Sequence, residues 1–242
     1  MKTRFIDIDI NLIHRKDVLN KCKEYLNGNR VRTIYFLNAH CYNVSQKNKE
    51  YKDVINRSNL LLNDGIGVKI GLAMNRLREK ENLNGTDLIP EIIELANKTN
   101  KNIFLLGGKP GVAEKAAVNL MKKYDECNIV GFNDGYFYDD EKIINDIVSK
   151  KTDILIVGMG VPIQELWIDK NKDKLKGVKI AIAGGAILDF MSENIRRAPK
   201  IVRKFKLEWV YRLINEPKRL FRRYLIGNFE FLYYMLKGKI VQ

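Results

Sequence analysis

The chain of 242 residues is poor in the residues that bind metal ions or form cross-links. Its three cysteines (Cys22, Cys41 and Cys127) are far apart and odd in number, and none forms a CxxC pair. We therefore expect neither a disulfide framework nor a zinc site, and a reducing compartment fits this pattern. Only two histidines occur, His14 and His40, which excludes a metal centre built from several histidines.

Long hydrophobic runs are also absent. The longest apolar stretches, residues 180–191 and 231–236, are shorter than the ~18 consecutive apolar residues that a membrane-spanning helix needs. The first 17 residues include basic residues but no apolar segment, so we expect no signal peptide. If such a protein meets a membrane, we expect it to lie on the surface.

Positive charge is abundant and unevenly placed. The net charge is +14, and residues 195–242 carry +10 of it, with 13 of the 43 lysines and arginines but only 3 of the 29 acidic residues. The same segment holds 9 of the 23 aromatic residues. A basic, aromatic tail on a nearly neutral body indicates an anionic partner: phosphate groups, nucleic acid or a membrane surface.

The first 190 residues alternate between short apolar runs and longer stretches with helical periodicity. The runs predict strands at residues 5–10, 33–37, 60–63, 102–106, 128–132, 153–157 and 178–183. The intervening patterns predict helices at residues 17–27, 40–48, 50–57, 86–98, 111–124, 140–150 and 163–174. Several runs are apolar throughout, as in parallel strands that are buried on both faces. We therefore predict an α/β fold with a mostly parallel sheet flanked by helices.

Ligands of such sheets collect at the carboxyl ends of the strands. The loops expected there comprise residues 38–40, 63–67, 107–110, 158–162 and 184–186. They carry seven candidate substrate-binding glycines: Gly65, Gly107, Gly108, Gly158, Gly160, Gly184 and Gly185. Glycine turns before a helix can present N–H groups to a phosphate, but they also serve as tight turns, and neither role is excluded here.

Asp64 lies in an Asn-Asp-Gly turn directly after the apolar run at residues 60–62. A carboxylate at this edge can accept a proton from a hydroxyl nucleophile. It can also cap the following helix at residues 66–75, and residue type alone favours this role because aspartates are common in such turns. Both interpretations stay open.

Two further groups of polar residues are candidates for the site. Gln164 and Glu165 fall in the first turn of a predicted helix; an amide both donates and accepts, as sugar hydroxyls require. Asp7 and Asp9 have the DxD spacing of many metal-dependent glycosyltransferases, but they alternate with isoleucines. We interpret them as the exposed face of a half-buried strand and assign no metal.

The basic tail has two segments with helical periodicity. The first has apolar residues at Leu207, Val210, Tyr211 and Ile214. After Pro217, one face carries Leu220, Phe221, Tyr224 and Leu225, and the other carries Lys218, Arg219, Arg222 and Arg223. Basic amphipathic helices with aromatic flanks are typical of helices at a membrane interface. Packing on the body and a nucleic-acid surface are the alternatives.

Taken in order, these motifs resemble the WecG/TagA/CpsF family of bacterial glycosyltransferases. They read NAHxxN, NDGIGV, GTDL, LLGGKPGVAE, GMGVPIQELWI, GGAILDF, RRAP, LEWVYRL and PKRLFRR, over about residues 32–223. The resemblance implies a Rossmann-like core, residues 1–194, and a C-terminal appendage, residues 195–242, that docks on a membrane.

The resemblance also implies the activity. Members transfer a sugar, typically N-acetylmannosamine from its UDP form, to an undecaprenyl-diphosphate-linked sugar, with inversion and without a metal or other cofactor. They serve teichoic acid, capsule and exopolysaccharide synthesis. We therefore expect a UDP-sugar-dependent hexosyltransferase at the inner face of the cytoplasmic membrane, with an anionic lipid surface and no nucleic acid as partners. The oligomeric state stays open, with a homo-oligomer as one alternative.

Matched by position, the family's base corresponds to Asp64, its loop asparagine to Asn38 and its pocket glutamine to Gln164. The arginines that would neutralise the UDP diphosphate correspond to Arg212, Arg219 and Arg222, with Arg223 adjacent. Such cations are needed where no metal stabilises the leaving group.

The chain departs from the family pattern at Phe36 and Asn82, where many members have threonine and arginine. Both positions lie near the sugar pocket, so a different hexose donor is an alternative to N-acetylmannosamine. A second hypothesis is a non-catalytic protein whose tail binds anionic lipid or RNA.

Overall fold

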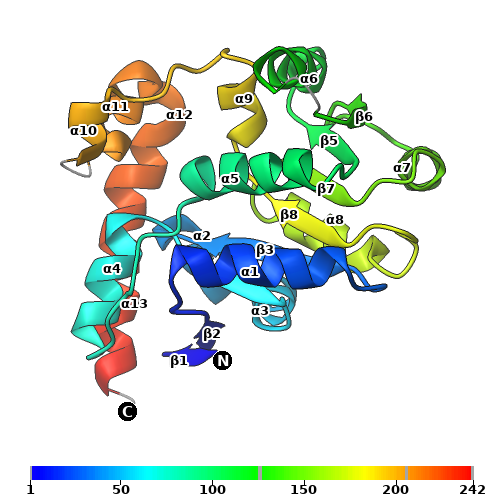
Figure 1. Cartoon of the computed structure of the whole chain (residues 1–242). Helices are drawn as coiled ribbons and strands as arrows, with labels where there is room; N and C mark the ends of the chain where they lie inside the picture. Colours follow the sequence, from blue (N-terminus) through cyan, green and yellow to red (C-terminus); the bar gives the residue numbers. More distant parts are fainter. Residues whose placement is uncertain (1, 125–126, 205–206, 241–242) are drawn as a thin grey trace.

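The computed structural model describes residues 2–124, 127–204 and 207–240 (Figure 1). Its centre is a sheet of six parallel strands in the order β4-β3-β8-β7-β5-β6. The strands are β3 (Arg32–Leu37), β4 (Leu60–Asn63), β5 (Ile103–Gly107), β6 (Ile129–Asn133), β7 (Ile154–Gly158) and β8 (Ile180–Ala183). Each lies within two residues of a predicted strand, and the predicted parallel α/β fold is confirmed.

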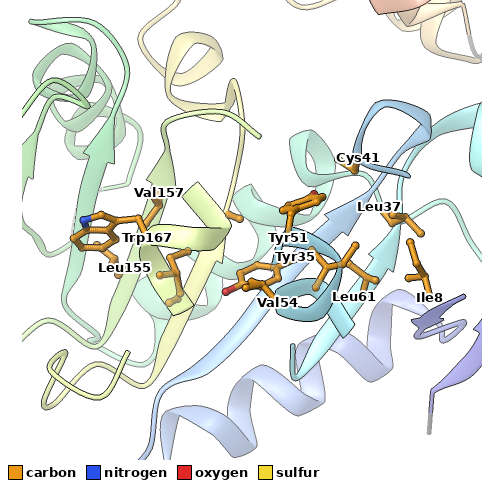
Figure 2. Packing of buried hydrophobic residues seen from close by; sticks show 14 of the residues in the cluster. Ile8, Tyr35, Leu37, Cys41, Tyr51, Val54, Leu61, Leu155, Val157 and Trp167 are labelled. Atoms are coloured by element: carbon orange, nitrogen blue, oxygen red, sulfur yellow. The ribbon is translucent and has the colours of Figure 1, made fainter. Parts of the chain in front are cut away.

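Helices cover both faces of the sheet, so that the core has two apolar layers. One face is covered by α1 (Arg15–Leu26), α5 (Gly85–Lys98), α6 (Val112–Lys123) and α9 (Ile187–Met191). The other is covered by α2 (Ala39–Lys47), α3 (Lys49–Asn56), α7 (Asp140–Ser149) and α8 (Ile163–Asn171). Figure 2 shows part of this second layer, where Tyr35 and Leu37 of β3 lie near Cys41, Tyr51 and Val54. Alternation along β3 sends Ile34 and Phe36 to the opposite layer.

The first predicted strand is wrong in its extent. Residues 5–10 do not form one strand: β1 (Thr3–Phe5) and β2 (Ile8–Ile10) pair as an antiparallel hairpin. Ile6 has a positive φ of 57°, and Asp7 lies in the turn. The Asp7 carboxylate accepts hydrogen bonds from Tyr42, Gln46 and Lys52. The aspartate of the turn is thus anchored to α2 and α3, and only Asp9 lies on a strand.

The C-terminal segment is helical and packs back on the core. It consists of α10 (Lys200–Lys204), α11 (Glu208–Asn215), α12 (Pro217–Phe221), a π-helical turn η1 (Arg222–Ile226) and α13 (Gly227–Ile240). In Figure 1 this segment passes beside α4 (Gly65–Met74) and ends at α13. Among the described residues, no helix combines the length and the apolar character that crossing a bilayer requires.

Helix α13 is seated by buried apolar side chains. Phe231 and Met235 are 2 % and 0 % exposed, and the Phe231 ring packs edge-on against Tyr42 of α2 at 5.5 Å. A Cβ atom on Gly71 of α4 would lie 2.7 Å from the Met235 sulfur. The absence of a side chain at Gly71 therefore allows α4 and α13 to approach closely. Asn43 adds a hydrogen bond of 2.7 Å to the Gly227 carbonyl.

Candidate active site

Two cavities meet at the carboxyl edge of the sheet. The sheet-edge cavity, of about 710 Å³, lies over the loops after β5, β7 and β8. The appendage cavity, of about 580 Å³, lies between α4, the loop at residues 79–87 and the C-terminal segment. Both are lined by the same five residues: Asn38, Asp64, Thr86, Arg212 and Arg223. A group transferred from one cavity to the other would pass these side chains.

Asp64 follows β4 and stands at the N-cap position of α4, but its side chain makes no capping hydrogen bond. The adjacent strand β3 is followed by Asn38, the N-cap residue of α2, whose side chain hydrogen-bonds to the Asp64 carboxylate. The side-chain oxygen Oδ1 of Asn38 accepts from the Cys41 N–H at 3.0 Å, which leaves the side-chain NH₂ for Asp64. Burial raises the pKa of Asp64, and the hydrogen bond from Asn38 offsets part of this effect.

Asn82 supplies the cap that Asp64 does not. Its side-chain oxygen accepts from the Gly65 N–H, the first N–H of α4, at 2.8 Å. The loop is held there because Asn63 donates to the Glu81 carbonyl at 2.7 Å and its own carbonyl accepts from Leu83. The Asp64 carboxylate is therefore not the cap of α4, and Asp64 lines both cavities.

The N–H groups of the glycine loops are used within the protein. Gly108 donates to the Gly158 carbonyl at 2.9 Å, and Gly184 donates to the Val157 carbonyl at 2.7 Å. The N–H groups of Gly160 and Gly185 both donate to Gln164. These four N–H groups are therefore not free to bind an anion.

Gly107, the one of the seven predicted glycines that lines neither cavity, is needed for close packing of the sheet. A Cβ atom on Gly107 would lie 2.4 Å from the Gly158 carbonyl oxygen, and Gly107 has a φ of +133°. Gly107 thus allows the paired ends of β5 and β7 to approach closely. Gly108, Gly158, Gly160, Gly184 and Gly185 line the sheet-edge cavity, whereas Gly65 lines the appendage cavity.

Arg212 and Arg223 provide the positive charge at the junction. Each guanidinium lies over an aromatic ring, Arg212 over Phe190 at 5.3 Å and Arg223 over Tyr224 at 5.9 Å. The Nε atom of each is buried and has no hydrogen-bond partner within the described part of the chain. Buried donors of this kind are costly to leave unpaired, so the arrangement favours an anionic ligand.

The other two predicted arginines differ. Arg222 is exposed and lines neither cavity. It directly precedes Arg223 in η1, and adjacent helical residues point in different directions. Arg219 belongs to α12, but its side chain lies outside the described part of the structure.

Gln164 and Glu165 begin α8 at the floor of the sheet-edge cavity, 2 % and 1 % exposed. The Gln164 side-chain oxygen accepts from Gly160 at 3.2 Å and from Gly185 at 3.0 Å. Its Nε2 donates to Oε1 of Glu165 at 2.8 Å. Both predicted residues thus lie in the site, and Gln164 directs both its side-chain oxygen and its Nε2 to groups of the protein.

Two residues of the cavities have no role in the sequence-based prediction. Thr86 lines both cavities and belongs to the GTDL motif. Glu208, from the LEWVYRL motif, lines the appendage cavity and raises the pKa of Asp64. The GTDL and LEWVYRL motifs are the sequence signals that mark Thr86 and Glu208.

An ion-pair cluster ties the start of the C-terminal segment to α5. Arg197 binds the Asp87 carboxylate at 2.6 Å, and Arg203 lies 3.7 Å from the same oxygen. Burial alone would raise the pKa of Asp87, but hydrogen bonds from Asn84 and Arg197 outweigh it and lower the pKa. The segment that carries Arg212 and Arg223 is thereby connected to the wall of the appendage cavity.

The fold and the site define a group-transfer enzyme for an anionic substrate: a parallel α/β sheet with a carboxylate between two cavities and two arginines beside it. The family model described as "Glycosyl transferase WecG/TagA/CpsF family" matches residues 3–242. The chain belongs to this family and is a glycosyltransferase of the hexosyltransferase class, as the sequence motifs predicted.

Curated relatives agree with this assignment. The N-acetylglucosaminyldiphosphoundecaprenol N-acetyl-beta-D-mannosaminyltransferase of Bacillus subtilis (strain 168) is 32% identical over 213 residues, which cover 88% of this chain and 82% of the relative. The enzyme of the same name from Staphylococcus aureus (strain MRSA252) is 26% identical over 243 residues, which cover 99% and 94%. These relatives favour an enzyme over the non-catalytic alternative.

Proposed function

We propose that this protein transfers N-acetylmannosamine from UDP to N-acetylglucosamine linked to undecaprenyl diphosphate, with inversion, in the synthesis of a cell-surface polymer. The names of the relatives support both sugars and the lipid carrier. The observation that carries the proposal is Asp64: a carboxylate that makes no capping hydrogen bond, hydrogen-bonded by Asn38, stands at the junction of two cavities.

The donor is assigned to the sheet-edge cavity and the acceptor to the appendage cavity. The sheet-edge cavity lies where parallel α/β sheets bind nucleotides. The appendage cavity is lined by Ile70 and Leu232, which are 45 % and 38 % exposed. Apolar side chains at its rim suit an acceptor that carries a lipid.

The reaction is a single in-line displacement. The acceptor hydroxyl forms a bond to the anomeric carbon while the bond from this carbon to the UDP oxygen breaks. Asp64 accepts the hydroxyl proton, and Asn38 holds its carboxylate in orientation. The electron pair leaves with UDP, whose added negative charge Arg212 and Arg223 neutralise. One carboxylate is sufficient because no covalent intermediate has to form and be hydrolysed.

The C-terminal segment is proposed to dock on the inner surface of the cytoplasmic membrane. Exposed large apolar side chains are concentrated there: Ile201, Leu207, Ile214, Phe221, Leu225, Ile226, Phe229, Leu232, Tyr233 and Leu236. Basic residues alternate with them in the sequence. Apolar side chains that enter the headgroup region, together with cations that attract anionic lipids, describe an interfacial segment.

The docking proposal is tested with point substitutions, because deletion of the segment would remove Phe231 and uncover core side chains such as Tyr42, against which Phe231 packs. Phe221→Ser combined with Phe229→Ser should reduce co-sedimentation with vesicles that contain phosphatidylglycerol, whereas Val118→Ser on α6, also at an exposed apolar position, should not. Equal vesicle binding by both variants would contradict docking through this surface.

The catalytic proposal is tested by Asp64→Asn, which keeps the shape of the side chain and removes its basicity. With UDP-N-acetylmannosamine and a short-chain analogue of the lipid acceptor, we expect transfer to fall by about 10²- to 10⁴-fold. Donor binding in calorimetry should change little. Asp53→Asn, the same change at an exposed position of α3, is the control. Near-normal turnover of the Asp64 variant would exclude it as the base.

A further inference from the structure

The loops after β7 and β8 are joined by one buried amide. Gln164 belongs to α8, yet its side-chain oxygen accepts from Gly160 of the first loop and from Gly185 of the second. The two N–H groups can be satisfied together only by an oxygen. A 180° flip of the amide would put its NH₂ group against two donors, so the orientation of Gln164 determines whether the loops are held together.

Glu165 is the residue that sets this orientation. Its Oε1 accepts from Gln164 Nε2 at 2.8 Å, and both side chains are almost completely buried. The backbone carbonyl of Glu165 accepts a hydrogen bond of 3.5 Å from the Tyr35 hydroxyl of β3. A carboxyl group in this position accepts from Gln164 whether it is ionised or protonated, because one oxygen is an acceptor in both states.

We propose that Glu165 is a positioning residue: through Gln164 it holds the loops after β7 and β8 in register and so shapes the donor cavity. This inference rests on the proposed function, because it assigns the sheet-edge cavity to the UDP-sugar. It assigns Glu165 to the support of the site, although Glu165 is among the residues that line the cavity.

The surroundings of Glu165 favour its neutral, protonated form. Its Oε2 is buried and has no hydrogen-bond partner among the described residues. Burial raises the pKa of Glu165 to about 7, and the hydrogen bond from Gln164 offsets only part of this effect. The groups that face it are Tyr35, Cys41 and Tyr51, which Figure 2 shows near one another on this side of the sheet.

These neighbours stay neutral near pH 7. Burial raises the pKa of Cys41 to about 12, and it raises the pKa values of Tyr35 and Tyr51 well above their usual range. Burial lowers the pKa of His40, in the appendage cavity, to about 4. Of these groups, only Glu165 therefore changes charge near neutral pH.

A pH-dependent donor affinity follows. Ionised Glu165 would place a buried negative charge beside the cavity that receives the diphosphate of the UDP-sugar, so donor binding favours the protonated acid. Affinity is full below the pKa of Glu165 and falls as the pH rises through it, by up to about tenfold per pH unit for one linked proton.

The first experiment measures binding of UDP-N-acetylmannosamine to the full chain by calorimetry from about pH 6 to about pH 8. We expect the wild-type affinity to fall about 5-fold or more over this range and that of Glu165→Gln, which imitates the neutral acid, to stay constant. Glu141→Gln, the same change at an exposed position of α7, should behave as wild type. Equal slopes for wild type and Glu165→Gln would overturn the neutral-acid argument.

The second experiment tests whether Glu165 acts through Gln164. Glu165→Ala and Gln164→Ala should each lower kcat/KM by about 10- to 100-fold, and the double variant should lose no more than either single one. Additive losses, or a Glu165→Ala enzyme as active as wild type, would overturn the proposal. Glu165→Gln retains the acceptor oxygen and should keep near-normal activity at about pH 6.

Hydrogen–deuterium exchange provides a readout that needs no substrate. The N–H groups of Gly160 and Gly185 should exchange faster in Glu165→Ala and at the wild-type rate in Glu165→Gln. Unchanged protection in Glu165→Ala would overturn the positioning role even if the donor failed to bind. Absence of donor binding to the wild type would instead overturn the proposed function, while exchange still decides the role of Glu165.

Discussion

Arg222 and Arg223 are neighbours of equal charge, and the structure predicts that only one of them serves the reaction. Arg223 lines both cavities with a buried Nε atom that has no hydrogen-bond partner among the described residues. Arg222 is exposed and lines neither cavity. The comparison of Arg223→Gln with Arg222→Gln therefore separates a binding role from a general contribution of positive charge.

The expected magnitudes follow from these environments. A hydrogen bond to a charged group contributes about 1.5–3 kcal/mol, so loss of the Arg223 guanidinium should lower kcat/KM by about 10- to 150-fold. An exposed charge contributes at most about 1 kcal/mol and is screened by salt, which limits the effect of Arg222→Gln to about 5-fold.

The assay measures release of UDP with a detergent-solubilised, short-chain acceptor, so that membrane docking does not limit the rate. The Arg222 variant should approach wild type as the ionic strength is raised, and the Arg223 variant should not. A loss in Arg222→Gln as large as that in Arg223→Gln, or an Arg223 variant within about 3-fold of wild type, would refute the assignment.

Three further predictions concern the base and the packing around α4. Burial raises the pKa of Asp64, and a base must be ionised to accept a proton. As the pH is lowered, kcat should therefore fall with an apparent pKa above the ordinary carboxylate value of about 3.9. An apparent pKa of kcat at or below that value contradicts the placement of the base. Asn82→Ala leaves the Gly65 N–H without its acceptor and should draw Asp64 into the capping role, which should lower kcat about 10-fold. The control is Asn48→Ala, which removes the cap of α3. It should lower the free energy of unfolding by about 1 kcal/mol and leave kcat unchanged. Gly71→Ala should reduce the free energy of unfolding, measured in urea, by about 1 kcal/mol, because overpacking against α13 outweighs the gain in helix propensity. An increase in stability would contradict close packing of α4 on α13 at this position.

Much of the fold could be predicted because it depends on local patterns. The apolar runs of β5, β7 and β8 are typical of strands buried on both faces, and the helices between them show regular periodicity. The hairpin of β1 and β2 was missed because the turn at Ile6 and Asp7 has no glycine or proline to mark it. Hydrogen bonds from α2 and α3, remote in sequence, hold this turn instead.

The sequence predicted where the candidate site lies, but not the hydrogen bonds that hold its loops together. Asp64 and Asn38 follow adjacent parallel strands, so the sheet brings them together. The capping of α4 by Asn82 depends on a loop that Asn63 folds back, and no spacing rule predicts this hydrogen bond.

By itself, the sequence determined the parallel α/β fold, the edge at which ligands bind, the candidate base and the family, because these depend on periodicity and on motifs. Only the tertiary structure decided which charges enter the cavities and which polar groups support them. Arg222 and Arg223 are adjacent in the π-helical turn η1, yet only Arg223 lines the cavities. The contacts of Gln164 with Gly185 and of α13 with Gly71 join residues from different elements. Such contacts form only when the chain is packed, since hydrogen bonds and close approach are decided by distance in space.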